Sequence, residues 1–251
     1  MDLQLHGKVV VVTGGGAGIG AAVARLGAEQ GAQVAVLDLE IGAVDAALLA
    51  IRCDVGREGD VRAAFGEVRE RLGGLDGLVC CAGVDVGGLA HELSTQAWER
   101  VLRTNLLGVH LACREALRLF LAEARGGSIV CVSSPLAFVG VPGGTSAYSA
   151  SKGGVSALVR TLAVDYAAHG VRVNALVPGP TDTALMWANV PAGDVDRLRE
   201  LIGREVPLGR LAAPEEPARA ALWLLSDEAS YVTGSHLFCD GGVTAKASIS
   251  V

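Results

Sequence analysis

Lysine, aromatic residues and long hydrophobic runs are scarce in this sequence of 251 residues, and each shortage narrows the possible functions. Aromatic residues make up 4% of the chain, and the only lysines are Lys8, Lys152 and Lys246. No stretch approaches the ~18 consecutive apolar residues that a membrane helix needs, so we expect no membrane span. The N-terminus shows no basic segment followed by an apolar one, so we expect no signal peptide and a cytoplasmic location.

Basic blocks and metal-binding patterns are also missing. The net charge is −6 and no cluster of lysines or arginines occurs, which argues against nucleic-acid and anionic-membrane partners. The six cysteines form no C-x-x-C pair, and the five histidines show no ligand spacing. We therefore expect no metal, and we interpret the cysteines as small buried side chains in a reducing compartment rather than as metal ligands or disulfides.

What the sequence does contain is an alternation of short apolar runs and longer amphipathic segments. Apolar residues make up 51% of the chain and charged residues 19%, which is typical of a globular protein. The runs predict strands at 9–12, 34–37, 51–53, 78–81, 128–134, 171–177 and 236–239. They predict helices from Ile19, over a short stretch from Ala43, and at 57–72, 95–123, 147–169 and 214–225.

Strands that are almost entirely apolar must be covered on both faces, which is typical of parallel sheets wrapped by helices. Seven strand–helix repeats without a closing eighth favour an open, doubly wound, Rossmann-type α/β sheet over a barrel. No linker or change of composition divides the chain, so we expect residues 1–251 to form one domain.

A glycine-rich turn, Thr13–Gly20 (TGGGAGIG), lies between the first strand and the first helix. Such a turn lets the backbone approach a pyrophosphate, whose charge meets the positive end of the helix dipole. Asp38 ends the second strand, where a carboxylate can accept hydrogen bonds from an adenosine ribose. The simpler interpretation of Asp38 is a solvated acid at a strand end.

The same carboxylate discriminates between nicotinamide cofactors. A 2′-phosphate placed ~4 Å from Asp38 would be repelled by roughly 2–8 kcal/mol. Ala17 and Leu39 occupy the nearest positions of the loop and the strand end, and neither carries a positive charge. We therefore expect NAD rather than NADP.

Tyr148 and Lys152 lie four residues apart near the start of a predicted helix, on one face of it. A tyrosine pKa of about 10 must shift by ~3 units for action near pH 7, and one positive charge ~4 Å away at an effective dielectric of ~20 supplies that shift. Because arginine is used nearly everywhere else, a lysine here suggests that a compact ammonium is needed. The pair predicts a general acid/base, whereas the simpler interpretation is an exposed helix pair.

Over essentially its whole length, the chain resembles the short-chain dehydrogenase/reductase family. Two motifs in this order and separation are jointly specific, T-G-x-x-x-G-x-G at 13–20 and Y-x-x-x-K at 148–152. The remaining matches are Asp38, Asp54, Ala82-Gly83, Asn105, V-S-S at 132–134, Pro178-Gly179 with Thr183, and Asp240-Gly241-Gly242.

The resemblance implies a role for each matching residue. Tyr148 is the expected proton donor and acceptor, and Lys152 is expected to lower its pKa and bind the nicotinamide ribose. Ser134 is expected to hold the substrate oxygen, Asn105 a water that links Lys152 to solvent, and Asp54 the adenine amine. The cofactor-binding residues implied in this way are Gly14, Ala17, Gly18, Ile19, Asp38, Leu39, Asp54, Val55, Cys81, Ala82, Gly83, Tyr148, Lys152, Pro178, Gly179, Thr181 and Thr183.

Two departures from the family pattern affect the site. Cys81 stands where the family usually has asparagine, which removes a polar contact beside the cofactor cleft. The loop between Ser134 and Tyr148 is one residue longer than the common pattern, apparently at residues 142–144. The register of the fifth strand favours Ser134 over Ser133 as the substrate-binding serine; if Ser133 is the right one, the strand must end a residue earlier.

Residues 182–206 have the position of a substrate lid. Its apolar residues, among them Leu185, Met186 and Trp187, suit an apolar alcohol or ketone, although they would equally suit packing on the sheet or on a second subunit. No lysine or arginine lies near Thr183 in the sequence to mark an anionic substrate. The apolar faces of 101–121 and 155–166, which the family uses in a homotetramer, lead us to expect the same assembly.

The leading hypothesis is an NAD-dependent oxidoreductase that interconverts a secondary alcohol and a ketone, with Tyr148 handling the proton. A 3-oxoacyl-thioester reductase shares every motif, but Asp38 speaks against the NADPH that such enzymes usually take. A catalytically silent NAD-sensing or scaffold protein is the alternative of another class, although all four expected catalytic residues are present here.

Overall fold

Seven parallel strands form one sheet in the order β3-β2-β1-β4-β5-β6-β7 in the computed structural model, which describes residues 3–246. Each neighbouring pair runs parallel. The predicted doubly wound parallel sheet is thus confirmed. The strands are β1 (Val9–Thr13), β2 (Gln33–Asp38), β3 (Leu49–Arg52), β4 (Gly77–Cys80), β5 (Gly127–Val132), β6 (Val171–Pro178) and β7 (His236–Cys239).

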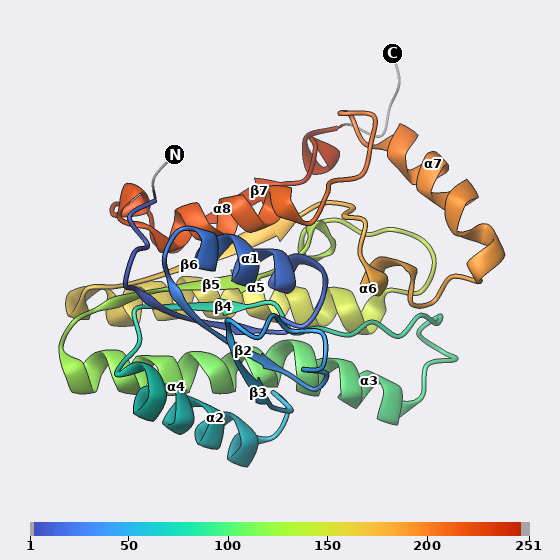
Figure 1. The fold of residues 1–251 in the computed structure, drawn as a ribbon. Coiled ribbons are helices and arrows are strands. Elements are labelled where there is room, and N and C mark those ends of the chain that lie inside the picture. The colour runs from blue at the N-terminus through green and yellow to red at the C-terminus, as the bar shows by residue number, and fades with distance from the viewer. Residues whose placement is uncertain (1–2, 247–251) are drawn as a thin grey trace.

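Helices cover both faces of the sheet, as Figure 1 shows in a view towards its β3 edge. One layer contains α1 (Gly18–Glu29) and α8 (Glu215–Leu225). The opposite layer contains α2 (Glu58–Leu72), α4 (Gly108–Glu123) and α5 (Ser146–Tyr166). The remaining helices are α3 (Thr95–Leu102), which leads into α4, and α6 (Ala184–Trp187) and α7 (Val195–Glu205), which lie beyond the strand ends.

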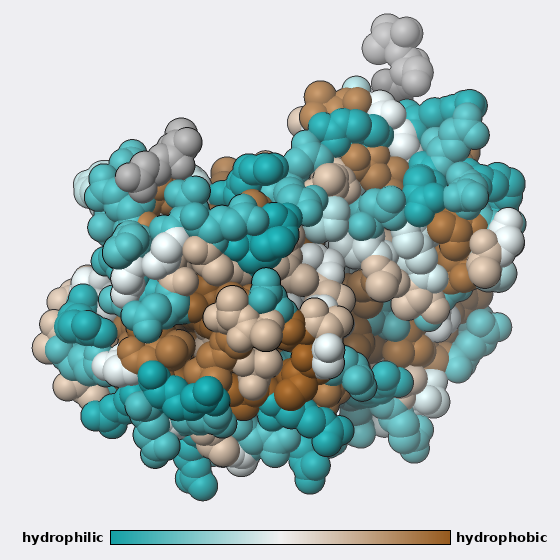
Figure 2. All heavy atoms as spheres, in the orientation of Figure 1, coloured by the Kyte–Doolittle hydropathy of each residue, from teal (hydrophilic) through white to brown (hydrophobic). Residues whose placement is uncertain are grey.

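The valines of β1 explain why both faces are covered. Successive side chains of a strand point to opposite faces, so Val9 and Val11 enter the core beneath α2, α4 and α5, while Val10 and Val12 enter the core beneath α1 and α8. All four are at most 4% exposed. Figure 2 shows the apolar residues gathered at the level of the sheet between polar helical surfaces.

The strand order creates a crevice at the carboxyl ends of β1 and β4. From β1 the chain proceeds outwards through β2 to β3, then returns to β4 on the other side of β1. The loops that follow β1 and β4 therefore diverge into opposite layers, which leaves a crevice between them. In open α/β sheets, ligands bind at this switch point.

Three sequence predictions about local structure are wrong. Residues 41–48 form turns instead of a short helix, because the Asp45 carboxylate accepts a hydrogen bond from the Ala47 N–H at 2.9 Å and so stabilises a turn. The predicted helix 95–123 is interrupted by a π-helical turn at Arg103–Leu107. Strands β4 and β5 end at Cys80 and Val132, earlier than predicted, so the functional residues that follow lie on loops.

Within residues 3–246, no helix is both long and apolar enough to cross a membrane.

Candidate active site

The glycine-rich loop approaches the loop after β4 more closely than a side chain would allow. Gly14 has a φ of +67°, and a Cβ there would lie 2.5 Å from the Ala82 Cα. Only glycine meets both demands. Since Ala82 and Gly83 follow β4, this contact joins the two sides of the crevice, and the predicted cofactor residues Gly14, Ala82 and Gly83 lie together.

A cleft of about 410 Å³ continues from this loop along α1. Gly16 and Gly18 line one side, and Asp182, Thr183 and Ala184 line the other. The Thr183 Cγ2 would contact a Cβ of Gly18 at 3.2 Å, so Thr183 closes tightly over the start of α1. Because no acidic residue lies in the first turn of α1, the positive end of its dipole is uncompensated. The glycine loop and this uncompensated helix end suit a dinucleotide pyrophosphate at the start of the cleft.

Asp38 lies at the edge of this loop. Its Oδ2 accepts a hydrogen bond from the Gly16 N–H at 2.8 Å, and its Oδ1 accepts one from the Glu40 N–H at 3.1 Å. These bonds hold the carboxylate beside the glycine loop, where the sequence predicts the adenosine ribose.

Sequence reasoning overlooked a cation near Asp38. Arg52 is the residue of β3 that pairs with Asp38 in the sheet register, and its Nε donates to the Leu39 carbonyl at 3.3 Å. The expectation that no basic residue lies near this carboxylate is therefore wrong. Residues far apart in the sequence become neighbours through β2–β3 pairing, and Ala17 and Leu39 alone did not reveal it.

Asp54 and Val55, the predicted adenine contacts, follow β3. The Asp54 Oδ1 accepts a hydrogen bond from the Gly56 N–H at 2.9 Å, which fixes the carboxylate in a turn. Val55 is buried, and its side chain packs so closely on α4 that a Cβ at Gly108 would lie 2.8 Å from the Val55 Cγ2. This turn thus packs directly on the helix layer that contains α4.

Tyr148 and Lys152 are brought together on the first turns of α5. The Lys152 Nζ lies 5.5 Å from the centroid of the Tyr148 ring and donates to the Val132 carbonyl at 2.7 Å. Lys152 is only 3% exposed, so the simpler interpretation of an exposed helix pair is wrong. The carbonyl at the end of β5 replaces part of the hydration that the ammonium loses on burial.

The two serines after β5 point to different partners. Ser133 Oγ bonds within α5, to the Lys152 carbonyl at 3.3 Å and the Ser156 Oγ at 2.8 Å. Ser134 caps a short 3₁₀ turn by accepting from the Leu136 N–H at 3.2 Å, and its hydroxyl also hydrogen-bonds to Tyr148. Although β5 ends early, it is Ser134 that faces the phenol.

The protein's own residues hold Tyr148 in its protonated form. Burial raises the pKa of the phenol from 10.0 to about 12, the hydrogen bond with Ser134 lowers it, and the charge of Asp85 raises it. Burial also lowers the pKa of Lys152 from 10.5 to about 8. Desolvation of the phenolate is thus the largest influence on this pKa, and the expected lowering of it by Lys152 stays a prediction.

Asn105 is fully buried in the π-helical turn at 103–107. Its Oδ1 accepts from the Val84 N–H at 2.8 Å, and its Nδ2 donates to the Val84 carbonyl at 2.9 Å and to the Ser151 Oγ at 3.2 Å. The amide therefore clamps the loop after β4 onto α5. A Cβ at Gly83 would lie 3.5 Å from the Asn105 Oδ1 and 3.9 Å from the Lys152 Nζ, so Gly83 keeps open the space between these two side chains.

Cys81 lies at the cofactor side of the same loop. Its N–H donates to the Thr13 carbonyl at 3.0 Å, and burial raises the pKa of its thiol to about 12. The thiol is thus an uncharged, weakly polar group where the family usually has an amide. Whether this weakens cofactor binding stays a prediction.

Cys80, Cys113 and Cys131 come together in the core below the sheet, with their sulfur atoms within 4.8 Å of one another. Nothing in their sequence spacing indicated this. Each is at most 1% exposed, and the Cys113 and Cys131 sulfurs hydrogen-bond at 3.8 Å. We assign no ion to this group, and the expectation of a metal-free protein stays a prediction.

The predicted nicotinamide-side residues follow β6. The Gly179 N–H donates to the Cys239 carbonyl, Thr181 forms a bridge with Ala212, and Thr183 caps α6 by accepting from the Met186 N–H. Pro178 is the last residue of β6. The segment thus leaves the sheet at the crevice and runs directly into 182–206.

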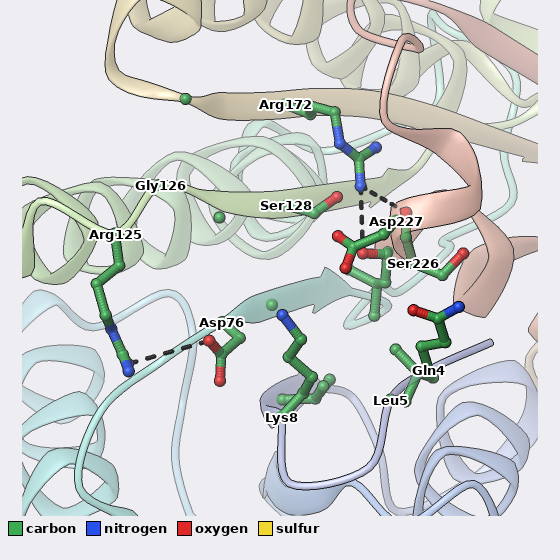
Figure 3. Close-up of a pocket in the computed structure, with 15 residues that line it drawn as sticks. Gln4, Leu5, Lys8, Asp76, Arg125, Gly126, Ser128, Arg172, Ser226 and Asp227 are labelled. Carbon is green, nitrogen blue, oxygen red and sulfur yellow. Dashed lines mark hydrogen bonds and ion pairs between the residues drawn. The ribbon is translucent and has the colours of Figure 1, made fainter.

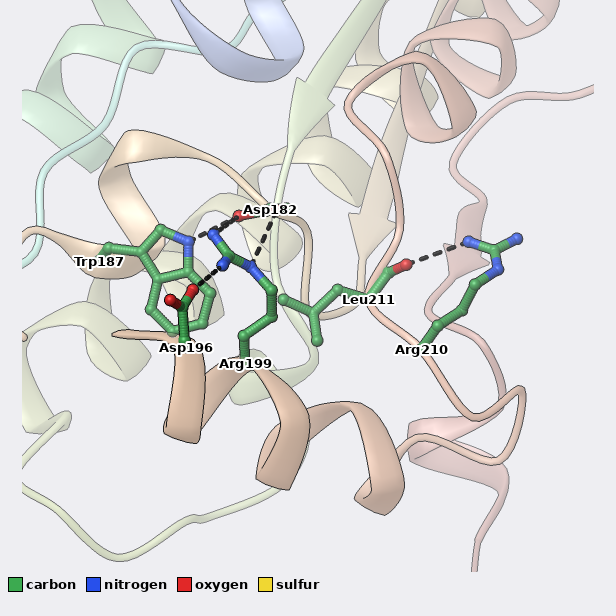
Figure 4. A network of polar contacts seen from close by, with 6 residues as sticks. All are labelled: Asp182, Trp187, Asp196, Arg199, Arg210 and Leu211. Carbon is green, nitrogen blue, oxygen red and sulfur yellow. Dashed lines mark hydrogen bonds and ion pairs between the residues drawn. The ribbon is translucent and has the colours of Figure 1, made fainter. Parts of the chain in front are cut away.

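An arginine folds back onto the start of segment 182–206, as Figure 4 shows. Arg199 of α7 donates from Nε to the Asp182 Oδ2 at 3.2 Å and lies 5.3 Å from the Trp187 ring centroid. The Trp187 Nε1 donates to the Asp182 Oδ1 at 2.7 Å, and Asp196 also pairs with Arg199. A cation therefore does lie near Thr183, but two carboxylates neutralise it.

A second pocket lies at the opposite, amino-terminal ends of the strands (Figure 3). It is lined by Lys8, Asp76, Arg125 and Arg172 among others. The Arg172 guanidinium donates to four main-chain carbonyls, those of Leu224, Leu225, Ser226 and Val232, at 2.8–3.4 Å. These contacts stabilise the end of α8, and none of the predicted site residues lies here.

Asp85 is a site residue that sequence reasoning missed. It follows the clamped Val84 and is close enough to Tyr148 for its charge to affect the phenol. A single aspartate in a polar loop gives no signal in the sequence, because only the fold brings the 84–88 loop against α5.

Comparisons with known proteins agree with this geometry. The profile of the family described as "Enoyl-(Acyl carrier protein) reductase" matches residues 14–244. The chain is 45% identical to cis-4-hydroxycyclohexanecarboxylate dehydrogenase of Sinomonas cyclohexanicum, over 95% of this chain and 97% of that protein. It is 40% identical to D-threitol dehydrogenase of Mycolicibacterium smegmatis, over 98% and 96% of the two chains. The structure of aldohexose dehydrogenase from Thermoplasma acidophilum superimposes with a TM-score of 0.93 at 32% identity, covering 100% of this chain and 99% of that one.

These relatives are dehydrogenases of hydroxyl compounds, so they do not favour the alternative of a 3-oxoacyl-thioester reductase or of a silent binding protein. Members of the family use nicotinamide cofactors. The chain is an oxidoreductase acting on CH–OH groups and belongs to the short-chain dehydrogenase/reductase family.

Proposed function

We propose that this protein interconverts a secondary alcohol and a ketone with NAD as its cofactor, and that Ser134, Tyr148, Lys152 and Asn105 carry the chemistry. The observation that supports this most strongly is the arrangement around Tyr148. Its phenol hydrogen-bonds to Ser134, and its ring lies 5.5 Å from the buried Lys152 ammonium. The group lies beside the loop that contacts the glycine turn.

The roles follow from protonation states. With its pKa near 12, Tyr148 carries its proton at neutral pH and is poised to donate it to a ketone oxygen. Ser134 supplies a second hydroxyl to the same oxygen, which stabilises the charge that develops there. A bound nicotinamide supplies the hydride for reduction or accepts it in oxidation. In the oxidative direction, Tyr148 must first lose its proton, and Lys152 stabilises the resulting phenolate.

Asn105 has a positioning role in this scheme. The side-chain amide of Asn105 is already bonded to Val84 and Ser151. A water at this position would therefore donate to the main-chain carbonyl of Asn105, in the π-helical turn. Gly83 leaves room between Asn105 and Lys152 for such a proton relay.

The preference for NAD rests on Asp38. Its carboxylate is held by the Gly16 and Glu40 N–H groups at the ribose end of the crevice, where a 2′-phosphate would be repelled. Arg52, the β3 neighbour of Asp38, would offset part of this repulsion, and its Nε donates to the Leu39 carbonyl. We therefore expect NAD to be preferred by about tenfold or more.

We further propose that residues 1–251 act as one domain, that segment 182–206 covers the substrate, and that four copies assemble. Exposed apolar residues on the helices predicted to pair between subunits support the assembly: Leu107, Leu121 and Val164 are 44%, 42% and 79% exposed. The six free thiols suit a reducing compartment, and we propose a cytoplasmic location on that ground.

A substrate screen tests the proposal. Purified protein is mixed with cyclic, aromatic and acyl secondary alcohols and ketones, and NADH absorbance is followed with NAD(H) and NADP(H) in parallel. Turnover of an alcohol or ketone with NAD(H) favoured supports the proposal. A clear preference for NADP(H) would refute the role of Asp38, and absence of turnover with every compound would favour a silent binding protein.

A further inference from the structure

Asp85 is held at the edge of the proposed catalytic group by the residue before it. Both main-chain groups of Val84 are bonded to the Asn105 amide, at 2.8 and 2.9 Å, and Asn105 is fully buried. The direction in which the chain enters Asp85 is therefore fixed. The carboxylate is near enough to Tyr148 that its charge raises the pKa of the phenol.

One oxygen of this carboxylate is buried without a hydrogen-bond partner. Only three buried side-chain oxygen or nitrogen atoms in residues 3–246 lack a partner, namely Asp85 Oδ1, Ser146 Oγ and His236 Nε2. Burial raises the pKa of Asp85 while the Val86 N–H lowers it, so the local structure satisfies the carboxylate only in part. A buried polar atom without a partner costs free energy that a ligand can recover.

The surroundings of Asp85 are the loops expected to contact substrate. The Gly88 N–H donates to the Gly144 carbonyl at 3.1 Å, which joins the 84–88 loop to the loop before α5. A Cβ at Gly87 would lie 3.9 Å from the Asn189 Nδ2 of segment 182–206. Ser146, the second residue with an unpartnered oxygen, lies two positions after Gly144 and two before Tyr148.

We propose that Asp85 accepts a hydrogen bond from a second hydroxyl group of the substrate, so that the protein prefers diols or polyols to simple alcohols. The proposal rests on the proposed function, because it places the second hydroxyl beside the carbinol that Tyr148 would deprotonate.

The charge of Asp85 selects among substrate groups. A hydroxyl donor satisfies the unpartnered oxygen, whereas a hydrocarbon leaves it buried and unpaired, and a carboxylate at this point is repelled by it. Hydrogen bonds to charged groups contribute about 1.5–3 kcal/mol, which corresponds to about 10- to 100-fold in specificity. The sequence favoured an apolar alcohol or ketone. At the position beside Asp85, we now expect a hydroxyl group on the substrate instead.

Specificity ratios test the proposal. The quantity measured is kcat/KM for each cyclohexanediol isomer and for D-threitol, divided by kcat/KM for cyclohexanol. Aminocyclohexanol and hydroxycyclohexanecarboxylate are measured in the same way as alternative substrates. In the unaltered protein, the best diol should exceed cyclohexanol by about tenfold or more. In Asp85→Leu this ratio should fall towards one. Glu92→Gln is the control, because it removes a charge from an exposed side chain between β4 and α3, the segment that also contains Asp85, and it should leave the ratio unchanged.

A binding measurement makes the outcome independent of turnover. In Tyr148→Phe saturated with NAD, calorimetry compares the dissociation constants of the best diol and of cyclohexanol, and the comparison is repeated in Tyr148→Phe/Asp85→Leu. Tighter diol binding that is lost with Asp85 supports the proposal, even if no alcohol is oxidised and the proposed function fails. Equal binding of the two compounds in Tyr148→Phe, or a diol preference that survives Asp85→Leu, overturns it.

Discussion

The Lys152 ammonium lies 5.5 Å from the centroid of the Tyr148 ring while donating to the Val132 carbonyl at 2.7 Å. Lys152 is buried and Tyr148 is half-buried, and desolvation moves their pKa values in opposite directions, up for the phenol and down for the ammonium. Compared with water, this environment therefore favours the neutral phenol of Tyr148 and the neutral amine of Lys152.

Alcohol oxidation should accelerate with pH, because the phenol pKa is raised and only the phenolate can accept the proton. Asp85→Asn removes a negative charge that disfavours the phenolate, so the phenol pKa falls. If the lost repulsion is about 1 kcal/mol, the rising limb of kcat/KM should move down by about half to one pH unit. Stopped-flow rates at saturating NAD measure this shift. An unmoved limb, or one moved upwards, would show that Asp85 does not act on Tyr148.

Lys152→Met should abolish activity while stabilising the fold. The folded pKa of about 8 lies below the model-peptide value of 10.5, so burying the ammonium costs free energy at pH 7. Its removal should raise the free energy of unfolding by on the order of 2 kcal/mol, after the lost bond to Val132 is subtracted.

The pH dependence of the free energy of unfolding provides a control for the prediction on Lys152→Met. Between about pH 8 and pH 10, the unfolded chain binds more protons at Lys152 than the folded one, so this residue makes stability rise with pH. Urea melts of both proteins should show that Lys152→Met flattens this rise. A less stable variant with an unchanged slope would contradict the account.

Gly83→Ala should impair turnover without unfolding the protein. The new methyl would lie 3.5 Å from the Asn105 Oδ1 and 3.9 Å from the Lys152 Nζ, which are ordinary contacts, but it fills the space of the proposed relay. We expect kcat to fall by about tenfold or more with an unchanged melting temperature. Gly66→Ala, where a Cβ meets nothing within 4 Å, is the matched control. Normal kcat in Gly83→Ala would rule out a relay through this space.

Asp38→Asn should weaken the preference for NAD. The asparagine keeps an acceptor for the Gly16 N–H but removes the charge that repels a 2′-phosphate, and Arg52 remains nearby. The ratio of kcat/KM for NAD over NADP should drop by about tenfold or more. Adding Arg52→Gln should restore part of it by weakening NADP binding. A ratio that Asp38→Asn leaves unchanged would mean that another group sets the preference.

The sequence predicted those features that depend on local pattern. The four valines of β1 had to alternate between two cores, and the glycine loop had to precede α1, because neighbouring residues decide both. Tyr148 and Lys152 share a helical face by spacing alone. Ser134 followed from the strand register, even though the strand ends two residues before it.

The features that sequence reasoning missed depend on partners distant in the chain. Arg52 approaches Leu39 only through β2–β3 pairing, and Asp85 approaches Tyr148 only because Asn105 clamps the preceding residue. The balance of pKa shifts at Tyr148 also could not be read from spacing. It depends on how deeply the fold buries the phenol, because burial is the largest influence on its pKa.

The most direct test of the central claim is the rate of alcohol oxidation by Tyr148→Phe, measured in the same samples as its affinity for NAD. The phenylalanine keeps the ring against Lys152 and removes only the hydroxyl that bonds to Ser134. The account predicts a loss of kcat by about 100-fold or more with an NAD dissociation constant within about twofold of the parent value. A variant that oxidises the best alcohol at the parent rate would contradict it.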